Sequence, residues 1–178
     1  VFGVDLVQAQ IAIAAGAHFA DLGLDAHAPP APRGYAMQWR INAETLDASG
    51  NSRPGSGRVA DLRWPQGPGI RVDSHALQGG SPSPHYDSLL GKLIVHCATP
   101  RFEDVLRRSR RALADTRITG RATNLALLQA LGERAEMQNQ QVHTRWLEEV
   151  LPELLDSAEQ AAVHADLSLN LRDRSDQV

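Results

Sequence analysis

Large apolar side chains alternate strictly with small or polar ones along residues 35–42. The large apolar members are Tyr35, Met37, Trp39 and Ile41. Successive side chains of a β-strand point to opposite faces, so all four lie on one face and the other face is left to the small and polar residues. The alternation therefore predicts a strand that is half-buried, with only one side against a core.

Two further strands are expected after this one. Residues 58–64 and 70–77 are compatible with strands, and the Pro- and Gly-rich residues 65–69 form a turn between them. Residues 48–57 are rich in turn formers and predict a loop. Because short turns join antiparallel neighbours, three strands in this arrangement indicate an antiparallel sheet.

Helical spacing of apolar residues predicts helices on both sides of these strands in the sequence. We expect them over residues 5–15, from about Arg101 onward, over residues 124–132 and over residues 146–155. Residues 86–95 contain a short apolar run that fits either a strand or a helix, since periodicity alone does not separate the two. The predicted fold class is α+β, a mainly antiparallel sheet with flanking helices.

Composition places the chain among ordinary folded domains. It has 178 residues, 42% of them hydrophobic and 22% charged, with a net charge of −3, which argues against a disordered chain and a nucleic-acid-coating protein. The single Cys97 excludes an intrachain disulfide scaffold and fits a reducing compartment. The longest nearly apolar stretch, residues 11–20, is far shorter than the roughly 20 residues that span a bilayer. These features predict a cytoplasmic protein without a membrane anchor.

Most common catalytic motifs do not occur. Gly91-Lys92 is followed by Leu93 and lacks the glycine spacing of a P-loop, and the sequence has no Gly-x-Ser-x-Gly elbow. The seven histidines show neither helical i, i+4 pairing nor the company of several cysteines that a zinc site needs. We therefore expect no metal ion held wholly by this chain.

One constellation fits a reactive site. Strand periodicity puts Arg71, Asp73 and His75 on one face of the third expected strand. A guanidinium held by a strand is preorganised to stabilise an oxyanion, an enolate or a phosphate. The alternative, on the residues alone, is a solvated outer face of an antiparallel sheet.

Four arginines, at positions 107, 108, 110 and 111, lie on the expected helix that begins near Arg101. They could form a phosphate-binding stripe. The negative net charge, the lack of interleaved aromatic residues and the nearby carboxylates favour a solvated face or a subunit contact instead.

Five sequence blocks stand out in order along the chain: residues 3–16, 40–44 (Arg-Ile-Asn-Ala-Glu), 69–75, 86–94 (beginning Tyr-Asp-Ser-Leu-Leu) and 118–124. Together they resemble the C-terminal part of biotin carboxylases, over about residues 1–150. Residues 46–48 look more like the large acyl-CoA or pyruvate carboxylases, while Gln38 stands where stand-alone biotin carboxylases more often have Glu.

The resemblance implies an ATP-grasp ligase that uses ATP and bicarbonate to carboxylate biotin on a carrier. Arg71 aligns with the arginine that stabilises the biotin enolate, and Asp73 and His75 are expected to aim it. Tyr86, Asp87 and Ser88 are expected to brace the neighbouring loop, a structural role and not direct chemistry. The nucleotide-binding residues and the ligands of Mg²⁺ or Mn²⁺ precede this region in the family, so the isolated chain is expected to be an inactive excised piece.

Further expectations concern assembly. In the family this region dimerises; Arg101 matches an arginine of that contact, and His96 replaces its aromatic residue. Residues 144–147 resemble a segment that borders the adenine pocket. We expect residues 1–155 to form the biotin carboxylase C-terminal domain, of the rudimentary hybrid-motif type, and residues 156–178 a linker or frayed helix.

The expected partners are the biotin carboxyl carrier and carboxyltransferase parts of a homodimeric parent, without nucleic acid or membrane. Two alternatives stay open: a structural and dimerisation module without catalysis, and part of a related ATP-grasp ligase that does not use biotin.

Overall fold

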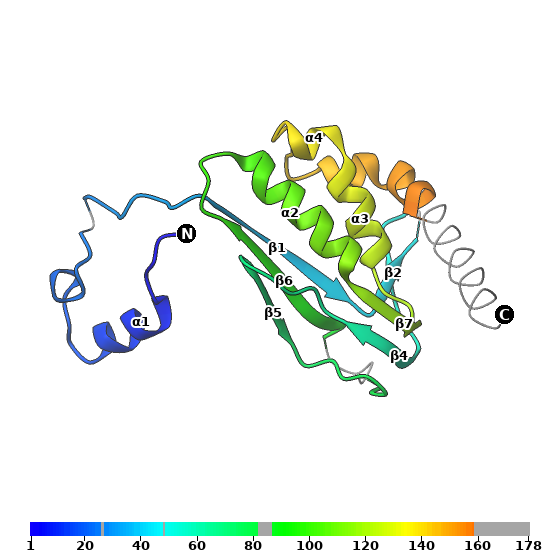
Figure 1. The fold of residues 1–178 in the computed structure, drawn as a ribbon, viewed down its shortest axis with the longest axis horizontal. Helices are drawn as coiled ribbons and strands as arrows, with labels where there is room; N and C mark the ends of the chain where they lie inside the picture. Colours follow the sequence, from blue (N-terminus) through cyan, green and yellow to red (C-terminus); the bar gives the residue numbers. More distant parts are fainter. Residues whose placement is uncertain (26, 48, 82–86, 159–178) are drawn as a thin grey trace.

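The computed structural model describes residues 1–25, 27–47, 49–81 and 87–158. Its N-terminal segment, with helix α1 (Leu6–Ala14) and the 3-10 turn η1 (Phe19–Leu22), extends away from the other elements (Figure 1). The Asp5 side chain begins α1 by accepting hydrogen bonds from the backbone N–H groups of Val7 and Gln8. The helix expected over residues 5–15 is confirmed.

A three-stranded antiparallel sheet forms the centre of the fold. Strand β6 (Leu89–Cys97) lies between β1 (Tyr35–Asn42) and β5 (Ile70–Ser74). The antiparallel sheet is confirmed, but the expectation that turns join three consecutive neighbours is wrong, because β6 separates β1 from β5 and β4 is not in this sheet. The ambiguous run at residues 86–95 is a strand from residue 89 onward, and residue 86 lies outside the described part.

Two small antiparallel sheets complete the strands. β2 (Glu44–Leu46) pairs with β3 (Ser52–Pro54), and β4 (Gly57–Arg63) pairs with β7 (Arg117–Arg121). The loop expected over residues 48–57 thus contains a strand. All three residues of β3 are exposed, so this strand carries no apolar alternation from which it could have been predicted.

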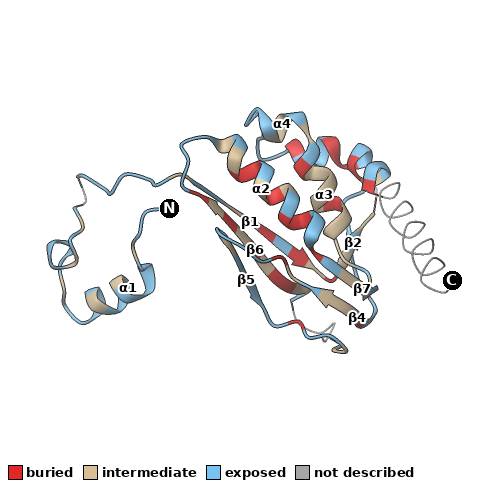
Figure 2. Cartoon of the chain, viewed as in Figure 1, coloured by how far each residue is buried: buried red, intermediate tan, exposed pale blue. Residues whose placement is uncertain are grey.

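The main core lies between the sheet and helix α2 (Phe102–Asp115), as the buried residues in Figure 2 show. Trp39 and Ile41 are 4% and 0% exposed, so the half-buried strand predicted over residues 35–42 is confirmed. Tyr35, at the start of β1, stays 39% exposed and meets the Phe102 ring edge-on at 5.7 Å. The buried partners of β1 are Leu93, Val95, Cys97, Val105, Leu106, Ala112 and Leu113.

A second apolar cluster joins the C-terminal helices. Helix α3 (Leu125–Glu133) is followed by the short α4 (Ala135–Gln138) and by a helix over residues 146–158. The helices expected over 124–132 and 146–155 are confirmed, and the second continues three residues further. Most of the expected linker or frayed helix, residues 159–178, lies outside the described residues. None of the described helices combines the length and apolar composition needed to cross a membrane.

Candidate functional site

The three-stranded sheet has one apolar face and one polar face. The apolar face packs against α2, while the register puts Arg40, Lys92 and Asp73 in one row across the polar face. The next row contains Gln38, Ile94 and Arg71. We call these six residues the polar sheet face. It gathers charged side chains from all three strands.

Arg71 stands on β5 with a side chain that is 71% exposed. Its Nη2 atom donates a hydrogen bond to Asp73 Oδ2 at 2.9 Å, and both residues lie on one face of β5, as the strand period predicts. An exposed ion pair contributes little to stability. Its main consequence here is to orient the guanidinium, while several of the five N–H donors stay open toward solvent.

His75 is not held on the strand with Arg71 and Asp73. β5 ends at Ser74, and His75 is an exposed residue beyond it, so the strand expected over residues 70–77 is too long. The Ser74 hydroxyl donates to the Leu90 carbonyl at 2.7 Å and accepts from the Ala76 N–H at 3.0 Å. This local turn ends the strand before His75 and breaks its period of two.

Asp87 supports the polar sheet face from the segment that precedes β6. Its Oδ2 lies 3.4 Å from Arg40 Nη2, and its Oδ1 accepts from the Leu89 N–H at 3.0 Å. Asp87 therefore fixes the entry into β6 and contacts β1 at the same time. Tyr86 lies outside the described residues, so its predicted bracing role stays a prediction.

Glu44 joins two of the sequence blocks through hydrogen bonds. Its carboxylate accepts from Asn42 Nδ2 at 2.8 Å, Ser52 Oγ at 2.7 Å and Ser88 Oγ at 2.9 Å. Burial alone would raise the pKa of Glu44, but these three hydrogen bonds outweigh burial and hold the pKa below its ordinary value. The carboxylate is therefore ionised at neutral pH.

Asn124 connects a third block to β1. Its side-chain oxygen accepts from the Asn42 N–H at 2.9 Å, and its Nδ2 donates to the Arg40 carbonyl at 3.1 Å. Neither Glu44 nor Asn124 is singled out by the sequence pattern. Both are polar residues within the sequence blocks 40–44 and 118–124. Such a residue could have been predicted to form hydrogen bonds, because a part-buried polar group needs partners.

The two residues expected at a dimer contact flank the connection from β6 to α2. Arg101 is 65% exposed and lies 3.5 Å from Asp104 Oδ1, whereas His96 Nε2 lies 2.9 Å from the Arg33 carbonyl. Both side chains thus have partners within the chain.

The described residues contain no group of three or more His, Cys, Asp or Glu side chains that could hold a metal ion. On the polar sheet face, the exposed Arg71 guanidinium is available as a donor toward an anionic group.

Comparison with known proteins gives a consistent family. The model of the biotin carboxylase C-terminal domain matches residues 38–149. An acyl-coenzyme A carboxylase alpha3 subunit of Mycobacterium leprae is 38% identical over 150 residues, covering 82% of this chain and 24% of that protein. The biotin carboxylase of a Nostoc species is 38% identical over 150 residues, covering 84% of this chain and 32% of its own length.

Solved structures agree with this result. The biotin carboxylase domain of a single-chain bacterial carboxylase superposes with a TM-score of 0.75 at 40% identity, covering 89% of this chain and 35% of that one. A single-chain, multi-domain long-chain acyl-CoA carboxylase gives a TM-score of 0.78 at 37% identity, covering 86% of this chain and 17% of that one. The chain thus spans about a third or less of these relatives.

Proposed function

Because the chain belongs to the biotin carboxylase C-terminal domain family, we propose that it forms the C-terminal part of a biotin carboxylase and supplies Arg71 to the ATP- and bicarbonate-dependent carboxylation of carrier-bound biotin. The observation that carries this proposal is the position of Arg71. It projects from a strand of the central sheet, is largely exposed and is paired with Asp73 at 2.9 Å.

Arg71 acts on developing negative charge. Biotin on its carrier supplies a ureido group whose ring N–H loses its proton to a base outside this chain before the nitrogen is carboxylated. The negative charge is then shared with the ureido oxygen, which becomes enolate-like. The Arg71 guanidinium donates hydrogen bonds to that oxygen more strongly in the transition state than in the ground state, which lowers the barrier. Because β5 and Asp73 already hold the guanidinium, little reorganisation is needed when the charge develops.

The remaining site residues position rather than react. Asp73 aims Arg71, Asp87 holds the start of β6, and Tyr86 keeps its predicted role of bracing the neighbouring loop. His96 and Arg101 contribute to a contact between two copies of the parent protein. The proposed domain comprises residues 1–155, with residues 156–178 as a linker.

Most of the reaction takes place on other parts of the parent. ATP and its Mg²⁺ or Mn²⁺ ion are bound mainly outside these 178 residues, as are the biotin carboxyl carrier and carboxyltransferase parts. The 178-residue chain is therefore inactive by itself and works in the cytoplasm as part of an acyl-CoA or pyruvate type carboxylase.

The test is the rate of carboxybiotin formation by the full-length parent carrying Arg71→Ala. Loss of one preorganised donor to a developing oxyanion lowers the rate by about 10²–10³-fold. The matched control is Arg117→Ala, which removes an arginine held by Asp61 at 2.8 Å on another sheet. Equal rates for Arg71→Ala and Arg117→Ala would contradict the role of Arg71.

A further inference from the structure

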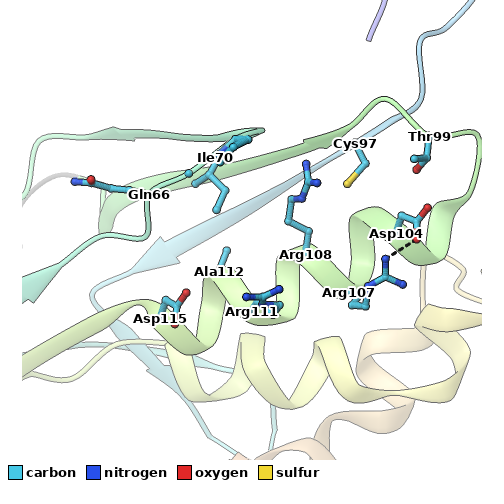
Figure 3. Close-up of a pocket in the computed structure, with 12 residues that line it drawn as sticks. Gln66, Ile70, Cys97, Thr99, Asp104, Arg107, Arg108, Arg111, Ala112 and Asp115 are labelled. Carbon is cyan, nitrogen blue, oxygen red and sulfur yellow. Dashed lines mark hydrogen bonds and ion pairs between the residues drawn. The ribbon is translucent and has the colours of Figure 1, made fainter.

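A cavity of about 370 Å³ lies between α2 and the turn that leads into β5 (Figure 3). Gly67 and Ile70 line it from the turn and the strand, and Cys97 lines it from the end of β6. Ile70 packs against the main core, whereas Arg71, the next residue, is exposed. The cavity is therefore on the opposite face of β5 from Arg71.

The four neighbouring arginines of α2 are divided between two sides of the helix. Arg107, Arg108 and Arg111 line the cavity. Arg110 points to the other side, where its Nε donates to the Gly132 carbonyl at 2.6 Å and lies 3.4 Å from Glu133 Oε1. The 107, 108, 111 spacing is that of one helical face, so the three cavity arginines act on the same space.

The acidic residues of the cavity do not neutralise all three arginines. Asp104 is engaged with Arg107 at 2.7 Å and Arg101 at 3.5 Å. The pKa of Asp104 lies below its ordinary value. The largest cause is a hydrogen bond from the Thr99 side chain, and a hydrogen bond from Arg107 and the nearby charge of Arg101 add to it. Asp104 therefore balances Arg107, and within the described part of the chain Asp115 is the other acidic residue that lines the cavity with Arg108 and Arg111.

Arg108 is fixed in the cavity wall. Its Nη1 donates to the His96 carbonyl at 2.8 Å, and in Figure 3 it extends from α2 to a position between Ile70 and Cys97. Gly69 has φ of +74°, and a Cβ atom there would collide with the His96 carbonyl and approach Arg108 Nη1 to 2.5 Å. Glycine at position 69 thus allows the Arg108 guanidinium to lie against the start of β5. The other N–H donors of Arg108 stay available.

Arg111 supplies the uncommitted charge at the cavity rim. Among the residues that the structure describes, neither Arg108 nor Arg111 lies within 4.0 Å of a carboxylate oxygen. Two guanidinium groups one helical turn apart, one fixed and one exposed, match the several oxygens of a phosphate or polycarboxylate group. The cavity volume of about 370 Å³ falls in the usual range for small-molecule sites.

We propose that this cavity binds a small, multiply charged oxyanion, the phosphate group of a small molecule, through Arg108 and Arg111. The ligand accepts hydrogen bonds from both guanidinium groups, and Asp115 lowers its affinity by repulsion. The site does not depend on the role of Arg71, because it lies on the other face of β5 and uses a different helix.

The test is calorimetric titration of the 178-residue chain with pyrophosphate at constant ionic strength and without divalent cations. The expected result is saturable binding that Arg111→Gln weakens about tenfold, the equivalent of one charge-assisted hydrogen bond. Arg108→Lys keeps the charge but loses the planar fork, and also weakens binding. Asp115→Asn removes a like charge and strengthens binding severalfold.

The control is Arg117→Gln, the same charge change on β7 outside the cavity. It leaves the affinity unchanged if the cavity is the site. Three outcomes would overturn the proposal: no saturable binding by the wild-type chain, unchanged affinity in Arg111→Gln while its circular dichroism spectrum is native, or equal losses in Arg111→Gln and Arg117→Gln. The last result would mean general attraction of an anion to positive charge.

Discussion

Ser88 Oγ donates a hydrogen bond to Glu44 Oε2 at 2.9 Å, linking residues 44 positions apart in the sequence. The Ala43 N–H donates to the Ser88 carbonyl at 2.7 Å, so backbone and side chain make the same connection. This contact ties the Arg-Ile-Asn-Ala-Glu block to the Tyr-Asp-Ser-Leu-Leu block. The two blocks therefore have a common structural task, which is to hold the end of β1 beside the start of β6.

Removing the Glu44 carboxylate is expected to destabilise the chain. Glu44→Ala leaves Asn42, Ser52 and Ser88 without their acceptor, and hydrogen bonds to a charged group contribute about 1.5–3 kcal/mol each before relaxation and water replacement reduce the loss. We expect a net loss of about 1–3 kcal/mol in the free energy of unfolding, measured by urea titration. The control Glu148→Ala removes an exposed glutamate and should change the free energy of unfolding little. Equal losses for Glu44→Ala and Glu148→Ala would contradict stabilisation by the hydrogen bonds to Glu44.

The contribution of Glu44 depends on pH in a defined direction. Its pKa is lowered on folding from the ordinary value of 4.5, so the unfolded state binds the proton more readily. The stabilisation is complete above pH 4.5 and is lost as pH falls through the folded-state pKa. The difference in unfolding free energy between wild type and Glu44→Gln should therefore shrink between pH 6 and pH 3. A difference in unfolding free energy that grows as the pH falls would contradict a pKa of Glu44 that is lowered on folding.

Asp73 is predicted to act through Arg71. In the full-length parent, Asp73→Asn should lower kcat for biotin carboxylation about tenfold and leave the KM for ATP unchanged, since it only loosens the guanidinium. Asp73→Glu should restore part of the rate by keeping the charge. The matched control is Asp61→Asn, because Asp61 is similarly exposed and holds Arg117 at 2.8 Å. Asp73 has no positioning role if the two Asn variants have the same kcat.

Apolar residues of α1 should matter far less to the stability of this chain than those of the main core. Leu6 and Ile11 are 70% and 65% exposed, whereas Leu93 is 0% exposed. We expect Leu93→Ala to cost about 2–5 kcal/mol in unfolding free energy, and Leu6→Ala or Ile11→Ala less than about 0.5 kcal/mol. A large loss in Leu6→Ala, measured by chemical unfolding, would mean that α1 packs against the domain.

The elements with strong periodicity could be predicted from the sequence, and β6 could not. β1 and α2 each bury one face, so their apolar residues recur with a clear period. Trp39 belongs to the buried face of β1, and Val105 belongs to the buried face of α2. β6 is the central strand, and both Leu93 on its apolar face and Leu90 in a smaller cluster are fully buried. Its apolar residues therefore follow one another without a period that separates strand from helix.

The candidate site shows the same division. Arg71 and Asp73 lie on one strand, so a period of two was sufficient to pair them. His75 was misplaced because the Ser74 hydroxyl bonds that end β5 involve Leu90, which is 16 residues away. The separation of Arg110 from Arg108 follows from the helical period of α2, because residues two positions apart point to different sides of a helix. Which elements lie against each side could not be read from one sequence.

The most direct measurement separates ATP cleavage from biotin carboxylation in the Arg71→Ala variant of the full-length parent. If Arg71 stabilises the biotin enolate, bicarbonate-dependent ATP cleavage in the absence of biotin should stay within about twofold of wild type, while carboxybiotin formation falls about 10²–10³-fold. Carboxybiotin formation at the wild-type rate, or a loss of ATP cleavage equal to the loss of carboxylation, would contradict this assignment.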